Sequence, residues 1–175
     1  MSSLWRETVR RITDGEKRAT ALEEAEWVGP VRGCLVIRTT AATINDITLT
    51  TVAFSTALWD LGACWSPAVS TRLIAPRDGY YVIGANIGWA NAADADGTRI
   101  LQIVDNDGNT IASVSQHGST DAYVGQTLQT PGPVHMAAGD YAVIKVYQSS
   151  GAAKKITTAS VANPYWCQAS IIRMH

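Results

Sequence analysis

Two turn-and-strand units, about sixty residues apart, constrain the fold of this chain more than any other feature. The first spans residues 72–83 and the second spans residues 138–147. In the first unit Pro76 and Gly79 precede a run of Tyr, Val and Ile, and in the second Gly139 does so. Pro and Gly interrupt strands, whereas aromatic and β-branched residues favour them. Each unit therefore predicts a turn that leads directly into an apolar strand.

Similar short runs, bounded by turn residues, recur along the chain after Pro30. Many short strands at such spacing are typical of an all-β sandwich or barrel. The expected strands lie near residues 31–39, 47–55, 71–75, 80–90, 98–105, 109–117, 122–130, 133–137, 140–148, 153–158 and 165–174.

Residues 1–30 differ in composition from the rest of the chain, because they hold 11 of its 29 charged residues. Apolar residues recur at a spacing near 3.6 among good helix formers, and this pattern predicts helix. Asp14-Gly15 interrupts the pattern, so the segment forms either one long helix or two short helices. One interpretation is an ordinary amphipathic helix that lies on its own domain. We expect instead an arm that anchors the chain to another protein or promotes oligomerisation. Its apolar contacts would be Leu4, Trp5, Val9, Ile12 and Leu22.

The alternation of apolar residues differs between two of the expected strands. In 80–90 the odd positions are apolar and the even positions include Gly and Asn, so one face is expected to be buried. In 140–148 both faces are largely apolar, and such a strand needs a second covering surface, most simply a neighbouring subunit. The predicted subunit interface is Tyr141, Val143, Ile144, Val146 and Tyr147.

Charge and cysteine content exclude several classes of protein. A net charge of −1 gives no electrostatic reason to expect binding to nucleic acid or to an anionic membrane. No apolar stretch approaches the roughly 18 residues of a spanning helix, and we expect a chain made in the cytoplasm without a secretory signal. Cys34, Cys64 and Cys167 are an odd number at wide spacing, which predicts buried free thiols and no zinc site.

The order of motifs from about Thr51 to His175 resembles the globular-head jelly roll of the complement and tumour necrosis factor superfamily, in the form found on bacteriophage particles. Residues 52–60 resemble the opening strand and its acidic turn, and residues 72–81 the step from proline to glycine-tyrosine. Residues 138–141 resemble the glycine-aspartate step into a central strand, and 166–172 the last strand, with its aromatic position shifted.

This resemblance implies a jelly roll of about ten strands that assembles as a homotrimer. Together with the change in composition after residue 30, it predicts a helical arm at 1–30, a connecting strand segment at 31–50 and the jelly roll at 51–175. It also implies a non-enzymatic structural protein of a virion, such as a capsid decoration protein, a head fibre or a tail fibre component. Residues 1–30 would then bind another virion protein.

Few residues point to chemistry. His117, His135 and His175 are scattered and have no nucleophile at motif spacing, so we expect no enzyme and no cofactor. The segment 105–109 contains acidic and amide residues in the manner of a calcium loop, but it lacks the closing Glu and suits a tight hairpin. The weak calcium candidates are Asp94, Asp96, Asp105 and Asp107.

Aromatic residues suggest the alternative function, a carbohydrate- or receptor-binding module that attaches to a host surface. Rings stack on sugar faces, and Trp59 and Trp65 flank a short segment that we expect to be a loop. For Trp89, at the end of an alternating apolar face, burial in the core is the expected role. For Trp59 and Trp65, packing and ligand binding both stay open.

Overall fold

A computed structural model of the chain describes residues 32–90, 94–119, 123–159 and 166–174. This described part is built from thirteen β-strands and one short 3-10 helix, and it contains no α-helix. The expectation of an all-β fold is confirmed. The predicted helical arm, with Leu4, Trp5, Val9, Ile12 and Leu22, lies outside the described residues.

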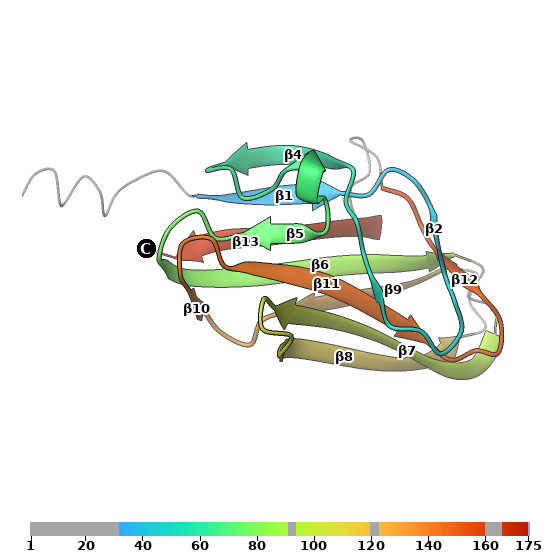
Figure 1. Cartoon of the computed structure of the whole chain (residues 1–175). Coiled ribbons are helices and arrows are strands. Elements are labelled where there is room, and N and C mark those ends of the chain that lie inside the picture. Colours follow the sequence, from blue (N-terminus) through green and yellow to red (C-terminus); the bar gives the residue numbers. More distant parts are fainter. Residues whose placement is uncertain (1–31, 91–93, 120–122, 160–165, 175) are drawn as a thin grey trace, which may run out of the picture. The chain divides into compact units, whose positions relative to one another are not determined.

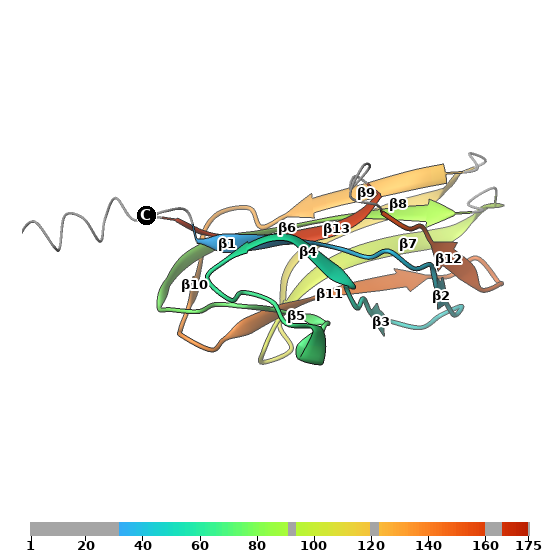
Figure 2. The ribbon, with the colours of Figure 1, turned by 90° about the horizontal axis from the view of Figure 1, so that it is seen from above.

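The strands form two antiparallel sheets that stack as layers of a sandwich (Figures 1 and 2). The first is eight-stranded and contains β2 (Ala42–Ile44), β12 (Lys154–Ile156), β6 (Gly79–Ala90), β13 (Cys167–Met174), β1 (Gly33–Ile37), β4 (Thr56–Leu61), β9 (Tyr123–Gln129) and β10 (Val134–Met136). The second is five-stranded and contains β3 (Thr50–Thr51), β11 (Tyr141–Gln148), β7 (Asp94–Asp105), β8 (Thr110–Ser119) and β5 (Arg72–Ile74). The 3-10 helix η1 (Pro67–Val69) connects β4 to β5.

Strand β6 is the centre of the eight-stranded sheet, because β13, β9, β10 and β12 all pair with it. Its odd residues point into the sandwich, and Tyr81, Ile83, Ile87 and Trp89 are fully buried. Burying one such side chain contributes about 1.5–3 kcal/mol. The predicted burial of one face of 80–90, including Trp89, is thus confirmed.

Strand β11 faces β6 across the core and alternates strictly between buried and half-buried residues. Ile144 and Val146 belong to the buried set and are fully enclosed by the two sheets of the same chain. No neighbouring subunit can touch them, so for these two residues the structure replaces the predicted interface with a place in the core. Tyr141, Val143 and Tyr147 lie on the opposite, half-buried face of the strand.

Two strands, β2 and β4, were not expected from the sequence. Strand β4 places Trp59 within the eight-stranded sheet opposite Leu35, where a loop had been predicted. Its pairing with β1 shifts register between Leu35 and Val36. Such a bulge interrupts the alternation of inward and outward side chains, which is the sequence signal of a strand. Because β1 and β2 also belong to this sheet, the sandwich includes part of the segment 31–50.

A buried amide connects the two sheets. The indole Nε1 of Trp89 in β6 donates to Oε1 of Gln126 in β9 over 2.8 Å. Nε2 of Gln126 in turn donates over 3.0 Å to the carbonyl of Arg99, in β7 of the other sheet. The Arg99 guanidinium also lies over the Trp89 ring, 5.8 Å from its centroid. Gln126 therefore satisfies polar groups from both layers in the middle of an apolar core.

Replacing Gln126 with Met should lower the free energy of unfolding by about 1–3 kcal/mol, because the Trp89 N–H would be left buried without an acceptor. Urea unfolding followed by circular dichroism measures the loss. In a Trp89→Phe background the same substitution should cost less, because the donor is already gone. An equal cost in both backgrounds would show that the hydrogen bond is not what Gln126 contributes.

Candidate functional site

The face of the eight-stranded sheet that points away from the core, called here the outer face, is the most unusual surface of the described chain. Strand pairing arranges its side chains in rows that cross the sheet. One row consists of Trp59, Leu35, Ser170, Gly84 and Gln129, and the next consists of Gln168, Asn86 and Thr127. On the other side of the first row lie Leu61, Gly33, Ile172 and Val82, followed by Met174, Tyr80 and His135.

None of the positions in these rows carries Asp, Glu, Lys or Arg. The nearest charged side chain in register is Lys155 of β12, opposite Ala90 at one end of the sheet. Solvent-facing sheets normally carry charged residues, which are almost never buried without a partner. A face without them is typical of a surface that is removed from water in an assembly.

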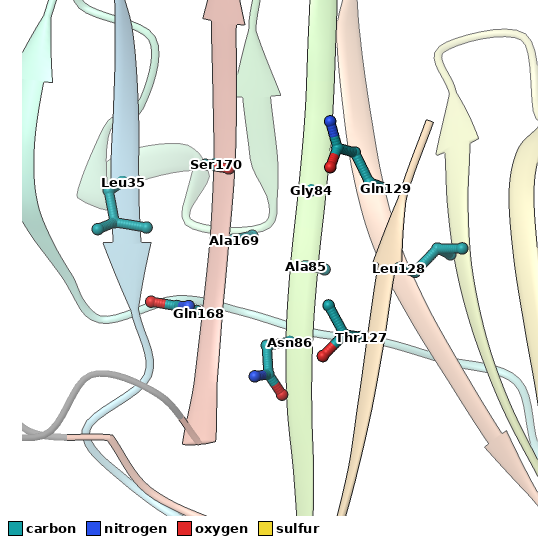
Figure 3. Close-up of a pocket in the computed structure, with 10 residues that line it drawn as sticks. All are labelled: Leu35, Gly84, Ala85, Asn86, Thr127, Leu128, Gln129, Gln168, Ala169 and Ser170. Atoms are coloured by element: carbon teal, nitrogen blue, oxygen red, sulfur yellow. The ribbon is translucent and has the colours of Figure 1, made fainter. Parts of the chain in front are cut away.

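The middle of the outer face is hollowed into a groove of about 190 Å³. Figure 3 shows its lining residues, which come from the adjacent strands β1, β13, β6 and β9. Gly84 contributes no side chain, and a Cβ there would lie 3.4 Å from the Ser170 hydroxyl. Five of the ten lining residues carry an uncharged amide or hydroxyl group: Asn86, Thr127, Gln129, Gln168 and Ser170. The Oδ1 atom of Asn86 is buried and accepts no hydrogen bond from the described residues.

One end of the outer face is apolar. Leu61, Tyr80 and Met174 are 53%, 57% and 47% exposed, which is high for large apolar side chains. Val82 and Ile172 lie between them in the register and are half-buried. The outer face therefore combines an apolar end with a neutral polar groove.

The corresponding face of the five-stranded sheet is different, because it carries cations. Lys145 lies on it in register with Thr51 and Gln102. Arg72 lies on it opposite Val143, with its guanidinium 4.1 Å from the centroid of the Tyr141 ring. The aromatic side chain is thus covered by a cation of the same chain, which suits a hydrated surface.

Comparison with known proteins identifies the fold. No protein-family model and no curated protein sequence matches the chain. Among solved structures, murine APRIL at pH 5.0 superposes with a TM-score of 0.60 at 13% identity, over 83% of this chain and all of the other. Eiger TNF from S. frugiperda gives 0.57 at 12% identity, over 84% of this chain and 94% of the other. The globular domain of zebrafish complement 1qA gives 0.53 at 12% identity, over 82% and 95%.

The fold is a TNF/C1q-like jelly roll. The resemblance stated from the sequence motifs is thereby confirmed at the level of the fold. At 12–13% identity the likeness concerns backbone architecture, since a common fold hosts many unrelated functions.

The two tryptophans of the predicted ligand loop have different surroundings in this jelly roll. Trp65 packs against the core, and its indole Nε1 donates to the carbonyl of Ser70 over 3.3 Å. Trp59 is half-buried on the outer face beside Leu35. The structure therefore does not bring the two indoles together on one exposed loop, and only Trp59 belongs to the outer face.

The remaining candidates for chemistry lie apart. His117 is in β8 of one sheet and His135 is in β10 of the other, where its ring meets Tyr80 edge-on at 5.2 Å. Within the described residues, no group of three or more His, Cys, Asp or Glu side chains could hold a metal ion. Asp94 and Asp96 belong to the start of β7, where side chains lie outside the described part. The same described part holds no helix long and apolar enough to cross a membrane.

The Asp105–Asn109 segment forms the tight β7–β8 hairpin, which was the other interpretation of the calcium-like sequence. Oδ1 of Asp105 accepts hydrogen bonds from the backbone N–H of Asp107 and Asn109, at 3.0 and 2.7 Å. Oδ2 accepts from Nδ2 of Asn109 at 3.1 Å. Both oxygens thus close the turn. Burial alone would raise the pKa of Asp105, but the hydrogen bonds from Asn109 and the turn amides outweigh it and lower the pKa.

This pKa predicts how the hairpin responds to acid. A carboxyl group with a lower pKa in the folded state stabilises the protein above its unfolded pKa of about 4, and that stabilisation is lost as pH falls through the folded value. Asp105→Asn should therefore be less stable than the wild type at pH 7, and the difference should shrink towards pH 3. Urea unfolding at both pH values measures it. A difference that does not change with pH would contradict this role of the carboxylate.

Proposed function

We propose that this chain is a non-enzymatic jelly-roll head that forms a homotrimer through the outer face of its eight-stranded sheet. The observation that carries the proposal is the absence of charged side chains from the rows of that face, in contrast to the Lys145 and Arg72 of the other sheet. An assembly removes such a face from water at little electrostatic cost, whereas burying unpaired cations is costly.

Exposed apolar side chains also support this face as the interface. Three large apolar side chains at one end, Leu61, Tyr80 and Met174, are about half exposed in the single chain and would gain burial in the trimer. The resemblance to the TNF/C1q-like jelly roll supports three subunits.

The sequence predicted the interface on β11, whereas the proposed interface lies on the eight-stranded sheet. A matched pair of substitutions distinguishes the two faces. Ser170→Arg places a charge in the groove, and Val143→Arg places one on the outer side of β11 next to Lys145. Sedimentation velocity at micromolar concentration should show a monomer for Ser170→Arg and the wild-type trimer for Val143→Arg. Circular dichroism checks that both variants are folded.

The reverse result, in which Val143→Arg dissociates and Ser170→Arg does not, would return the interface to β11. A wild-type chain that sediments as a monomer would overturn the assembly altogether. Trimers from both variants would show that neither face forms the interface.

We further propose that the trimer is a structural component of a bacteriophage particle and that residues 1–30 anchor it there. The sharp change in charge content after residue 30 and the resemblance to phage-borne jelly rolls support this role. A carbohydrate- or receptor-binding module is the alternative function. It has less support, because the Trp65 indole is engaged within its own chain.

The virion role predicts where the protein is found. Mass spectrometry of gradient-purified phage particles, made from a genome that encodes this chain, should detect it as a stoichiometric component. A chain that lacks residues 1–30 should still trimerise but should be missing from the particles. Absence of the wild-type chain from purified particles, or incorporation of the truncated chain at the wild-type level, would contradict the proposed role.

A further inference from the structure

Two cysteines that are thirty positions apart in the sequence meet beneath the β1–β4 pair. Cys34 in β1 lies directly opposite Asp60 in β4. The Asp60 carboxylate accepts hydrogen bonds from the backbone N–H of Cys64, at 2.8 Å, and of Trp65, at 3.2 Å. These bonds fold the segment after β4 back, so that the thiol of Cys64 lies beside the thiol of Cys34.

The turn that carries Cys64 has an unusual backbone. Gly62 has a φ of +136° and Ala63 a φ of +60°. Glycine tolerates such values, but alanine rarely adopts the left-handed region unless surrounding structure holds it there. The surrounding structure therefore holds this turn, and Cys64 directly after it is buried in the core.

The pair is also distinct from the third cysteine. Cys34, Cys64 and Cys167 are all fully buried, as the sequence predicted. The hydrogen bond between the first two raises the pKa of Cys34 and lowers the pKa of Cys64, because one thiol donates to the other sulfur. Cys167 shares no such bond, and burial raises its pKa to about 12. Only Cys34 and Cys64 have a thiol as a neighbour.

We propose that Cys34 and Cys64 are a disulfide site, at which the chain cross-links β1 to the turn after β4 when it folds in an oxidising environment. The oxidant is a small-molecule disulfide such as oxidised glutathione. The Cys64 thiolate attacks one sulfur of the reagent and releases one glutathione thiolate. The Cys34 thiolate then attacks the Cys64 sulfur and releases the second glutathione. The two cysteine thiols lose two protons and two electrons in total, and the reagent takes up both to become two thiols.

The cross-link would reinforce the first strand of the sheet. Strand β1 has only five residues, which pair with β13 on one side and with β4 on the other. A disulfide between positions 34 and 64 closes a loop of about thirty residues and restricts the unfolded chain. Because both sulfur atoms lie inside one chain, this inference does not depend on the proposed trimer.

The test is refolding of the full chain. Denatured, reduced protein is refolded in a glutathione buffer that is rich in the oxidised form, since full burial slows oxidation after folding. The product is then denatured and alkylated, and its peptides are mapped by mass spectrometry. We expect one alkylated cysteine, Cys167, together with a linked pair of peptides that contain Cys34 and Cys64. The melting temperature should rise by about 5–10 °C over the reduced protein.

Two cysteine variants test whether the cross-link joins Cys34 to Cys64. Cys167→Ala should form the same cross-link and show the same rise in melting temperature, whereas Cys64→Ala should show neither. Three alkylated cysteines in the wild type, mixed disulfides with glutathione at Cys34 or Cys64, or disulfides between chains would each overturn the proposal.

Discussion

The two faces of strand β6 carry different side chains, and the arrangement of both the core and the outer face depends on this difference. On one face, four large side chains, among them Tyr81 and Trp89, fill the core between the sheets. On the other face, Gly84 has no side chain and Asn86 is uncharged, and both residues line a groove. Since β13, β9, β10 and β12 all pair with this strand, its alternation sets the inward and outward faces of most of the eight-stranded sheet.

The division of charge between the sheets links the fold to the proposed function. Burying the outer face of the eight-stranded sheet would remove apolar and neutral polar groups from water, whereas burying that of the five-stranded sheet would also remove Arg72 and Lys145. Both sheets contribute buried side chains to the core of the single chain. The outer face of the eight-stranded sheet is therefore suited to assembly, and that of the five-stranded sheet is suited to contact with solvent.

The sequence predicted the fold class and most strands, because turn residues and two-residue alternation are local signals. It could not show which face of β11 needs a partner, since Tyr141 and Val143 are apolar by type and yet lie beside Arg72 of β5. Strand β4 was missed because a bulge accompanies its pairing.

The outer face and the cysteine pair were missed for another reason. Leu35, Ser170 and Gly84 become neighbours only through the register of three strands that are far apart in sequence. Cys34 and Cys64 become neighbours only through the Asp60 side chain and a strained turn. Such sites depend on long-range pairing, which composition and periodicity do not encode.

The uncharged rows of the outer face are proposed to make this jelly roll a subunit of a trimer. Native mass spectrometry of the full wild-type chain tests this proposal most directly, because it counts subunits without a substitution or a label. We expect a single species at three times the 18.7 kDa of one chain. A dominant species at the mass of one chain, from a sample at micromolar concentration, would contradict the proposal.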